Sequence, residues 1–236
     1  MANKETDILI IGGGLTGASL SLALQGLGFS VTLVESRPYS DKVNPDFDAR
    51  SLALSPASQR ILAMLGVWEI LKEYTTPIHM IHVSDQHRFG ASRLHGEKNS
   101  PLGYVVEMQY INRALSILIN KEHLLTPAAL KSIDFNNSTA TVAHGDDMIS
   151  IRAQLIVAAD GTESMTRYLC NLPVKIKDYA QDAIVANVGL IKPHGNRAFE
   201  RFTPNGPLAL LPMMNDKMSL VWASKPEEAK RLVMLN

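Results

Sequence analysis

The stretch that decides the fold is DILIIGGGLTG, residues 7–17. Residues 7–11 form a short apolar run, which is typical of a strand buried on both faces of a parallel sheet. The glycines after it lead into ASLSLALQGLG (residues 18–28), where apolar residues recur at helical spacing and Gly28 is the expected helix stop. Residues 30–35 (SVTLVE) predict a second strand. The order is therefore strand, glycine turn, helix, strand, as in a βαβ unit.

The glycine spacing predicts a phosphate-binding turn. Gly12 would permit the tight turn, Gly14 would let the backbone approach a pyrophosphate, and Gly17 would let the helix pack closely on the strand. A helix that begins there directs unpaired N–H groups and its positive dipole end toward the phosphates. The alternative is a glycine turn with a structural role only. The motif by itself does not separate NAD from FAD.

An acidic residue supports the dinucleotide interpretation. Glu35 ends the second predicted strand, where its carboxylate can accept hydrogen bonds from ribose hydroxyls and would repel a 2′-phosphate. We therefore expect the ADP half of a dinucleotide to contact this loop and the residues after the second strand. The expected contact residues are Gly12, Gly13, Gly14, Leu15, Thr16, Gly17, Glu35, Ser36 and Arg37.

The rest of the chain predicts an α/β fold: a Rossmann-like, three-layer ββα domain for FAD or NAD(P) with a sheet-based substrate region. Helices are expected at residues 55–65, 111–120 and 226–235. Strands are expected at residues 130–135, 139–144, 149–159 and in four runs between 182 and 224. The expected domains are a cofactor domain at residues 1–75 and 98–178, and a β-rich substrate region at residues 76–97 and 179–236.

Composition narrows the class of partner. Lys and Arg together number 23, as do Asp and Glu, so there is no net positive field to gather nucleic acid. The single cysteine, Cys170, and the absence of a signal-peptide pattern in MANKETD favour the cytoplasm. Apolar runs are far shorter than the roughly 20 residues that cross a bilayer, so any membrane contact is expected to be peripheral.

Three further segments point to a flavin. They are DFDARSLALSP (residues 46–56) with Arg50, QYINRAL with Arg113, and LIVAADGTESMTR (residues 155–167) with Asp160 and Gly161. With the glycine loop, these segments resemble the aromatic-ring-hydroxylating flavoprotein monooxygenases. Within that family, IHVSD (residues 81–85) and FERFTPNGPLALLPM (residues 199–213) are similar to the ubiquinone-pathway hydroxylases.

The resemblance implies a cofactor and a reaction. FAD would be bound by the glycine loop with Arg50, Arg113, Asp160 and Gly161, and NAD(P)H would reduce it transiently. Reduced flavin would capture O2, and the resulting flavin hydroperoxide would hydroxylate a prenylated phenol, with contact to a ubiquinone-biosynthesis assembly. The resemblance identifies no catalytic side chain here. The family's Gly-Asp segment for the ribityl chain does not occur in the sequence, so we expect an amino-terminal portion of a longer protein.

Other interpretations stay open for several residues. Arg50 and Arg113 could be surface or ion-pair arginines, and Asp160 with Gly161 could form only a turn. The histidines near residues 79–87 lack the cysteine or carboxylate cluster of a metal site, so no metal is expected. Cys170 is expected to be inert, and Met213, Met214 and Trp222 are expected to line a sheet face, either as core or as a pocket wall. A non-catalytic dinucleotide-binding module, or a flavoenzyme acting as an epoxidase, halogenase or reductase, is the alternative function.

Overall fold

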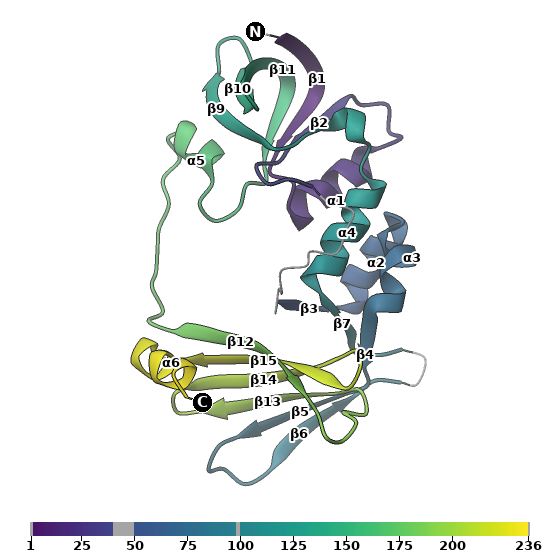
Figure 1. Ribbon diagram of the computed structural model, residues 1–236, viewed down its shortest axis with the longest axis vertical. Coiled ribbons are helices and arrows are strands. Elements are labelled where there is room, and N and C mark those ends of the chain that lie inside the picture. Colours follow the sequence, from purple (N-terminus) through teal and green to yellow (C-terminus); the bar gives the residue numbers. More distant parts are fainter. Residues whose placement is uncertain (1, 40–49, 98–99, 236) are drawn as a thin grey trace. The chain divides into compact units, whose positions relative to one another are not determined.

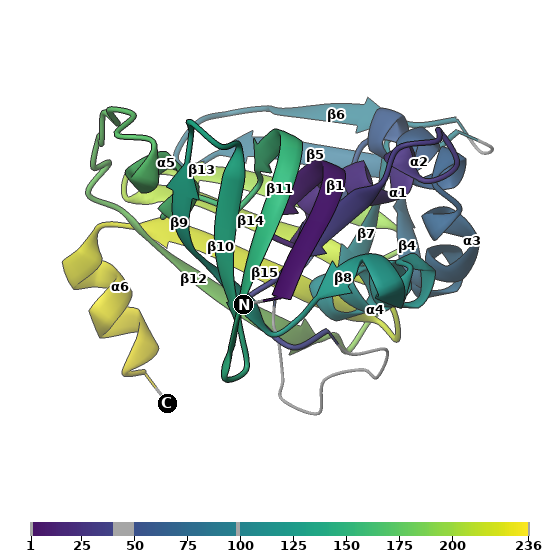
Figure 2. The same cartoon turned by 90° about the horizontal axis from the view of Figure 1, so that it is seen from above.

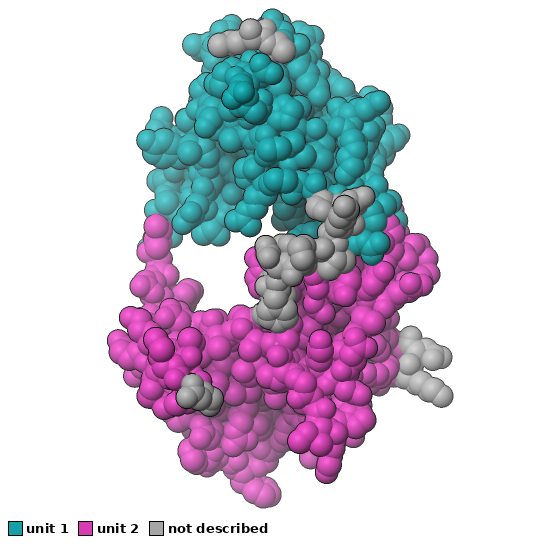
Figure 3. Space-filling model, in the orientation of Figure 1, with its two compact units in different colours: residues 1–43, 65–67, 111–175 teal, residues 44–64, 68–110, 176–236 magenta. Residues whose placement is uncertain are grey.

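The computed structural model describes residues 2–39, 50–97 and 100–235 (Figure 1). The chain divides into two compact units (Figure 3). Unit 1 comprises residues 1–43, 65–67 and 111–175, and unit 2 comprises residues 44–64, 68–110 and 176–236. The predicted division into a cofactor domain and a substrate region has other boundaries and stays a prediction.

Unit 1 contains a six-stranded sheet with the order β8-β2-β1-β11-β10-β9. Its strands are β1 (Ala2–Ile11), β2 (Val31–Val34), β8 (Leu124–Leu125), β9 (Ala128–Asp134), β10 (Thr139–His144) and β11 (Asp147–Ala158). Strand β1 runs parallel to both β2 and β11, and β10 runs antiparallel to both of its neighbours. Figure 2 shows β1, β11, β10 and β9 side by side.

Strand β11 pairs antiparallel with β10 and parallel with β1. Residues 149–152 of β11 pair with both β10 and β1. Among the strands that the structure describes, Ala153 and residues 155–158 of β11 pair only with β1. The strand thus carries the chain from an antiparallel meander into the parallel sheet that holds the glycine loop.

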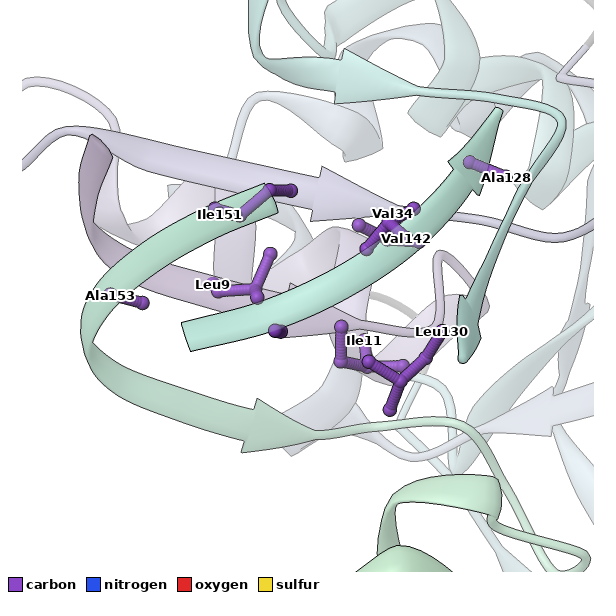
Figure 4. Close-up of a cluster of buried hydrophobic side chains, with 9 residues drawn as sticks. Leu9, Ile11, Val34, Ala128, Leu130, Val142, Ile151 and Ala153 are labelled. Carbon is purple, nitrogen blue, oxygen red and sulfur yellow. The ribbon is translucent and has the colours of Figure 1, made fainter. Parts of the chain in front are cut away.

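The core of unit 1 explains the apolar runs in the sequence. Leu9 and Ile11 of β1 lie in a buried cluster with Val34 of β2, and with residues of β9, β10 and β11 (Figure 4). All four residues of β2 are buried, as expected for a parallel strand covered on both faces. Helix α1 (Leu15–Leu24) packs against β1 and β2. The predicted βαβ unit is therefore present.

Helix α1 is shorter than its sequence pattern predicts. Gln25 is already extended, with φ −61° and ψ 134°, and Gly26 adopts φ +80°. A glycine enters this left-handed region without the steric cost that a side chain brings, so it commonly ends a helix. The prediction that Gly28 stops the helix is wrong, because Gly26 already follows the last helical turn.

Unit 2 contains a six-stranded sheet with the order β12-β15-β14-β13-β5-β6. The strands are β5 (Met80–Asp85), β6 (Ala91–His95), β12 (Asp182–Gly189), β13 (Arg197–Thr203), β14 (Gly206–Met213) and β15 (Lys217–Ser224). Only the β13 and β5 pair is parallel among these neighbours. The four predicted β runs after residue 182 are all strands of this sheet.

A second, three-stranded sheet in unit 2 was not predicted. It joins β3 (Ser51–Leu54), β7 (Gly103–Glu107) and β4 (Thr75–Ile78), all antiparallel. The remaining helices are α2 (Pro56–Met64), α3 (Val67–Leu71), α4 (Met108–Leu118), α5 (Met165–Leu169) and α6 (Pro226–Val233). Helix α2 begins where Ser55 Oγ accepts a hydrogen bond from the Ser58 N–H at 3.1 Å, the predicted cap.

The predicted α/β class is confirmed by these sheets and helices. No helix within the described residues combines the length and the apolar character needed to cross a bilayer.

Candidate dinucleotide site

Three parallel strands of unit 1 end at the same edge of the sheet. The residues that follow β1, β2 and β11 are the glycine loop, Glu35 and Asp160. Backbone hydrogen bonds tie these ends together, from the Gly12 N–H to the Val34 carbonyl at 2.8 Å and from the Ala159 N–H to the Ile11 carbonyl at 2.7 Å. In open α/β sheets, ligands bind at this carboxyl edge of the strands.

Two glycines of the loop are required by the chain itself. Gly12 has φ +102°, and a Cβ on it would lie 2.4 Å from the Ala159 carbonyl oxygen. A Cβ on Gly17 would lie only 1.9 Å from the Gly12 carbonyl oxygen, so the helix packs on the loop at a distance that no side chain allows. These positions correspond to the predicted tight turn and close helix packing.

Gly14 differs, because a Cβ on it would meet no atom within 4 Å. Gly14 is the N-cap residue of α1 and provides no side-chain cap for the helix. Within the described part of the chain, no acceptor contacts its N–H. Open space beside free N–H groups at the positive end of a ten-residue helix suits an anion. The loop therefore has the form of an anion site, as the pyrophosphate of a dinucleotide would need.

Glu35 is held in a fixed position beside this loop. Its Oε2 accepts a hydrogen bond from the Gly13 N–H at 2.6 Å, and its Oε1 accepts one from the Arg37 N–H at 2.7 Å. The Ser36 hydroxyl makes a longer bond to Oε1 at 3.3 Å. Because each carboxylate oxygen has two acceptor positions, Oε2 keeps one for a ribose hydroxyl. A second hydroxyl could replace Ser36 at Oε1.

We expect Glu35→Arg to weaken ADP binding by about 10- to 100-fold, the range given by loss of one hydrogen bond to a charged group. The substitution removes the ribose acceptor and also leaves the Gly13 N–H without its partner. Isothermal titration with ADP measures the change. Glu35→Gln is the matched control, since it keeps the shape and an acceptor oxygen and should cost less. Equal affinity of the arginine variant and the unaltered protein for ADP would show that Glu35 does not bind the ribose.

Asp160 makes its hydrogen bonds within its own loop. Its Oδ1 accepts from the Ser164 hydroxyl at 2.6 Å, and its Oδ2 accepts from the Thr166 N–H at 2.9 Å and hydroxyl at 3.0 Å. Gly161 has φ +83°, which lets the chain turn back toward α5. Burial pushes the pKa of the Asp160 carboxyl upward, but the hydrogen bonds from Ser164 and Thr166 outweigh it and hold that pKa below its ordinary value. The carboxylate thus fixes the turn that starts α5.

The lowered pKa of Asp160 predicts a pH-dependent contribution to stability. Hydrogen bonds to the carboxylate stabilise the folded chain fully above the unfolded pKa of about 3.9, and this stabilisation is lost as pH falls through the lower folded pKa. Asp160→Asn keeps one acceptor oxygen but turns an amide donor toward either Ser164 or Thr166, and should reduce the free energy of unfolding by roughly 1–3 kcal/mol at pH 7. Urea unfolding of both proteins between pH 7 and pH 3 should show this difference shrinking. A difference independent of pH would contradict the assignment.

The two predicted arginines stand in different units. Arg113 is a half-buried residue of α4 and belongs to unit 1. Arg50 is exposed and belongs to unit 2, where its carbonyl accepts a hydrogen bond from the Met108 N–H at 3.1 Å. Residues 46–49 of the DFDAR segment lie outside the described residues. The cofactor roles of Arg50 and Arg113 stay predictions.

Other singled-out residues have ordinary surroundings. Of the three histidines near residues 79–87, only His82 lies within β5, where its Nδ1 accepts from Arg93 Nε at 3.4 Å. Within residues 2–39, 50–97 and 100–235, no three His, Cys, Asp or Glu side chains gather as a metal site. Met213 lies in the buried core of unit 2, whereas Met214 is exposed. Cys170 is half-buried.

No sequence pattern indicated Tyr39 as a site residue, but the structure places its side chain against the glycine loop. Its hydroxyl donates a hydrogen bond to the Gly13 carbonyl. A Cβ on Gly13 would lie 3.0 Å from the Tyr39 ring and 2.7 Å from Glu35 Cβ. The need for glycine at position 13, the middle residue of GGG, is therefore explained by these two side chains. A tyrosine in a loop carries no periodic or motif signal, so only the tertiary contact could find it.

Two curated proteins are similar to nearly the whole of this chain. The Escherichia coli 3-demethoxyubiquinol 3-hydroxylase is 31% identical, with 100% of this chain and 62% of that protein covered. Ubiquinone hydroxylase UbiL of Rhodospirillum rubrum is 33% identical, with 99% and 55% covered. The chain thus spans little more than half the length of these curated relatives.

A solved structure agrees with the fold. The crystal structure of Pseudomonas aeruginosa PqsL in complex with 2-aminobenzoylacetate superposes with a TM-score of 0.80, at 21% identity, over 97% of this chain and 63% of that one. At this identity the likeness concerns the fold alone.

The model of the FAD binding domain family matches residues 5–232, nearly the whole chain. The chain belongs to the FAD binding domain family.

Proposed function

We propose that this chain is the cofactor-binding part of an FAD-dependent, NAD(P)H-using monooxygenase that hydroxylates a prenylated phenol in ubiquinone biosynthesis. The observation that carries the proposal is the open, uncapped start of α1 at Gly14 beside the fixed carboxylate of Glu35. The names of the two relatives support the reaction and the pathway. The sequence also resembles 2-octaprenyl-6-methoxyphenol hydroxylase in its FERFTPNGPLALLPM segment.

The residues of unit 1 would divide the binding of FAD between them. The N–H groups at the start of α1 would bind the pyrophosphate, and Glu35 would bind the ribose of the ADP half. Bound FAD, once reduced by NAD(P)H, would activate O2 and supply the oxygen atom that enters the phenol ring. The protein's part is to orient the ring and to keep water away from it, which needs no catalytic triad.

The proposed substrate sets conditions on where the protein works. A prenylated phenol is apolar along its tail, so the enzyme must reach a membrane surface or an assembly that shields the tail. We place the protein in the cytoplasm, with peripheral contact to the membrane or to a ubiquinone-biosynthesis assembly. The balanced charge gives no support to nucleic-acid binding.

The first experiment is an absorption spectrum of the purified chain after incubation with FAD and desalting. Retained flavin bands establish the cofactor and allow product analysis with prenylated phenols, O2 and NAD(P)H on a longer form of the protein. A hydroxylated phenol supports the proposal, while an epoxide, a halogenated or a reduced product assigns another reaction to the same fold. Binding of NAD without retention of flavin would overturn the proposal in favour of a dinucleotide-binding module.

A further inference from the structure

We infer that Tyr39 is a positioning residue that turns the Gly14 N–H toward the pyrophosphate of the bound dinucleotide. This inference rests on the proposed cofactor site, and it assigns a role to a side chain outside the glycine motif.

The peptide group between Gly13 and Gly14 is held on one side by Tyr39. Its carbonyl belongs to Gly13 and accepts the Tyr39 hydroxyl, and its N–H belongs to Gly14. This peptide bond is trans, because the one cis peptide bond within the described residues joins Thr126 and Pro127. In a trans peptide the C=O and N–H point to opposite sides. A carbonyl fixed on Tyr39 therefore directs the Gly14 N–H away from Tyr39.

The preceding peptide group is fixed from the same segment of chain. Glu35, four residues before Tyr39, accepts the Gly13 N–H at 2.6 Å. The N–H and the C=O of Gly13 are thus both engaged by side chains that follow β2, while Gly14 has open space beside its Cα and no acceptor on its N–H within the described residues. Glycine peptides otherwise rotate easily, because glycine populates a wide range of φ and ψ. The two side chains remove that freedom before the ligand arrives.

The tyrosine ring is itself held in place. One side packs against Gly13, and the Lys121 Nζ lies 6.0 Å from the ring centroid. Lys121 is anchored in turn, since its Nζ donates to the Ser116 carbonyl at 2.6 Å. Burial is the main cause that raises the pKa of Tyr39 far above its ordinary value, and the negative charge of Glu35 adds a smaller effect in the same direction. The phenol therefore stays protonated and remains a donor at neutral pH.

Tyr39→Phe tests the role of the hydroxyl, because it removes one oxygen and keeps the ring against Gly13. The affinities for FAD and ADP should fall about five- to tenfold, the effect of one neutral hydrogen bond that organises the site. Adenosine, which has no phosphate, should bind both proteins equally, as followed by NMR titration at millimolar concentration. Tyr168→Phe is the matched control, since Tyr168 is 75% exposed in the same unit, and it should change nothing.

The outcomes separate this inference from the proposed function. If the unaltered chain binds neither FAD nor ADP, the cofactor site fails and the inference fails with it. If it binds both, and Tyr39→Phe binds them equally well, only the inference fails. Equal losses for ADP and adenosine, together with a lowered unfolding temperature, would show a packing role and would also overturn it.

A second measurement needs no variant. The Gly14 amide resonance of the unaltered chain should move strongly downfield when ADP is added and should stay in place with adenosine, because only ADP brings an acceptor to that N–H. An unmoved Gly14 resonance at saturating ADP would overturn the inference even if Tyr39→Phe failed to fold.

Discussion

Gly17→Ala should destabilise the folded chain by roughly 3 kcal/mol or more, the upper range for overpacking a buried position. The added Cβ would lie 1.9 Å from the Gly12 carbonyl oxygen and 3.1 Å from Ala159 Cβ. Because the nearer atom is backbone, no side-chain rotation relieves the clash, and α1 must move off the sheet. Thermal unfolding followed by circular dichroism should show the midpoint lowered on the order of 10 °C for a chain of this size.

Gly14→Ala is the matched control for stability. It makes the same chemical change at the other end of the same turn, where a Cβ meets no atom within 4 Å. Its unfolding midpoint should stay close to that of the unaltered chain. If both alanine variants unfolded at the same temperature, the close packing of α1 on the loop would be contradicted.

Gly14→Val should abolish dinucleotide binding while leaving the fold intact. Gly14 has φ −64° and ψ −176°, an extended conformation that valine adopts readily, and its surroundings are open. That open space is where the pyrophosphate would lie, so the branched side chain would keep the phosphates from the backbone N–H groups. The expected loss of FAD and ADP affinity is at least about 100-fold, measured by equilibrium dialysis.

The expected result for Gly14→Val is an unchanged circular dichroism spectrum with no retained flavin. Retained flavin would contradict the assignment of this loop to the phosphates. Together with Gly17→Ala, the variant would separate the two uses of the glycine motif, one for packing and one for ligand access.

Local signals predicted much of the fold. Apolar runs bounded by glycine marked β1 and β2, and two runs around Asn-Asn-Ser marked β9 and β10. The bounds of β2, β9 and β10 lie close to those predicted, but β1 begins at Ala2, well before the apolar run at residues 7–11. The three-stranded sheet of β3, β4 and β7 was not predicted, because its short strands lack the glycine loop and helix that precede the equally short β2. Strands that short are stabilised by pairing with distant segments, and they leave too few residues for a period to appear.

The sequence predicted the parts of the candidate site that depend on backbone conformation, but not those that depend on side-chain hydrogen bonds. Spacing identified Gly12 and Gly17, which the packing of the chain requires, and Gly14, where the motif predicts access for the ligand. Spacing did not reveal that the Asp160 carboxylate is occupied by Ser164 and Thr166, or that Tyr39 bonds to the Gly13 carbonyl. Those partners are chosen by the folded chain, and their residue types are common in loops.

The parallel pairing of β1 with β11 has a consequence for how the protein forms. Ile8 of β1 lies beside Leu155 of β11, so the second neighbour of the central strand comes from far along the chain. Such pairings carry a high contact order, because a long loop must close before the contact stabilises anything, and sheets built on them form slowly. On the ribosome, β1, α1 and β2 are made first and must wait for β11. The edge of β1 that β11 later covers is therefore the surface that a nascent chain exposes longest.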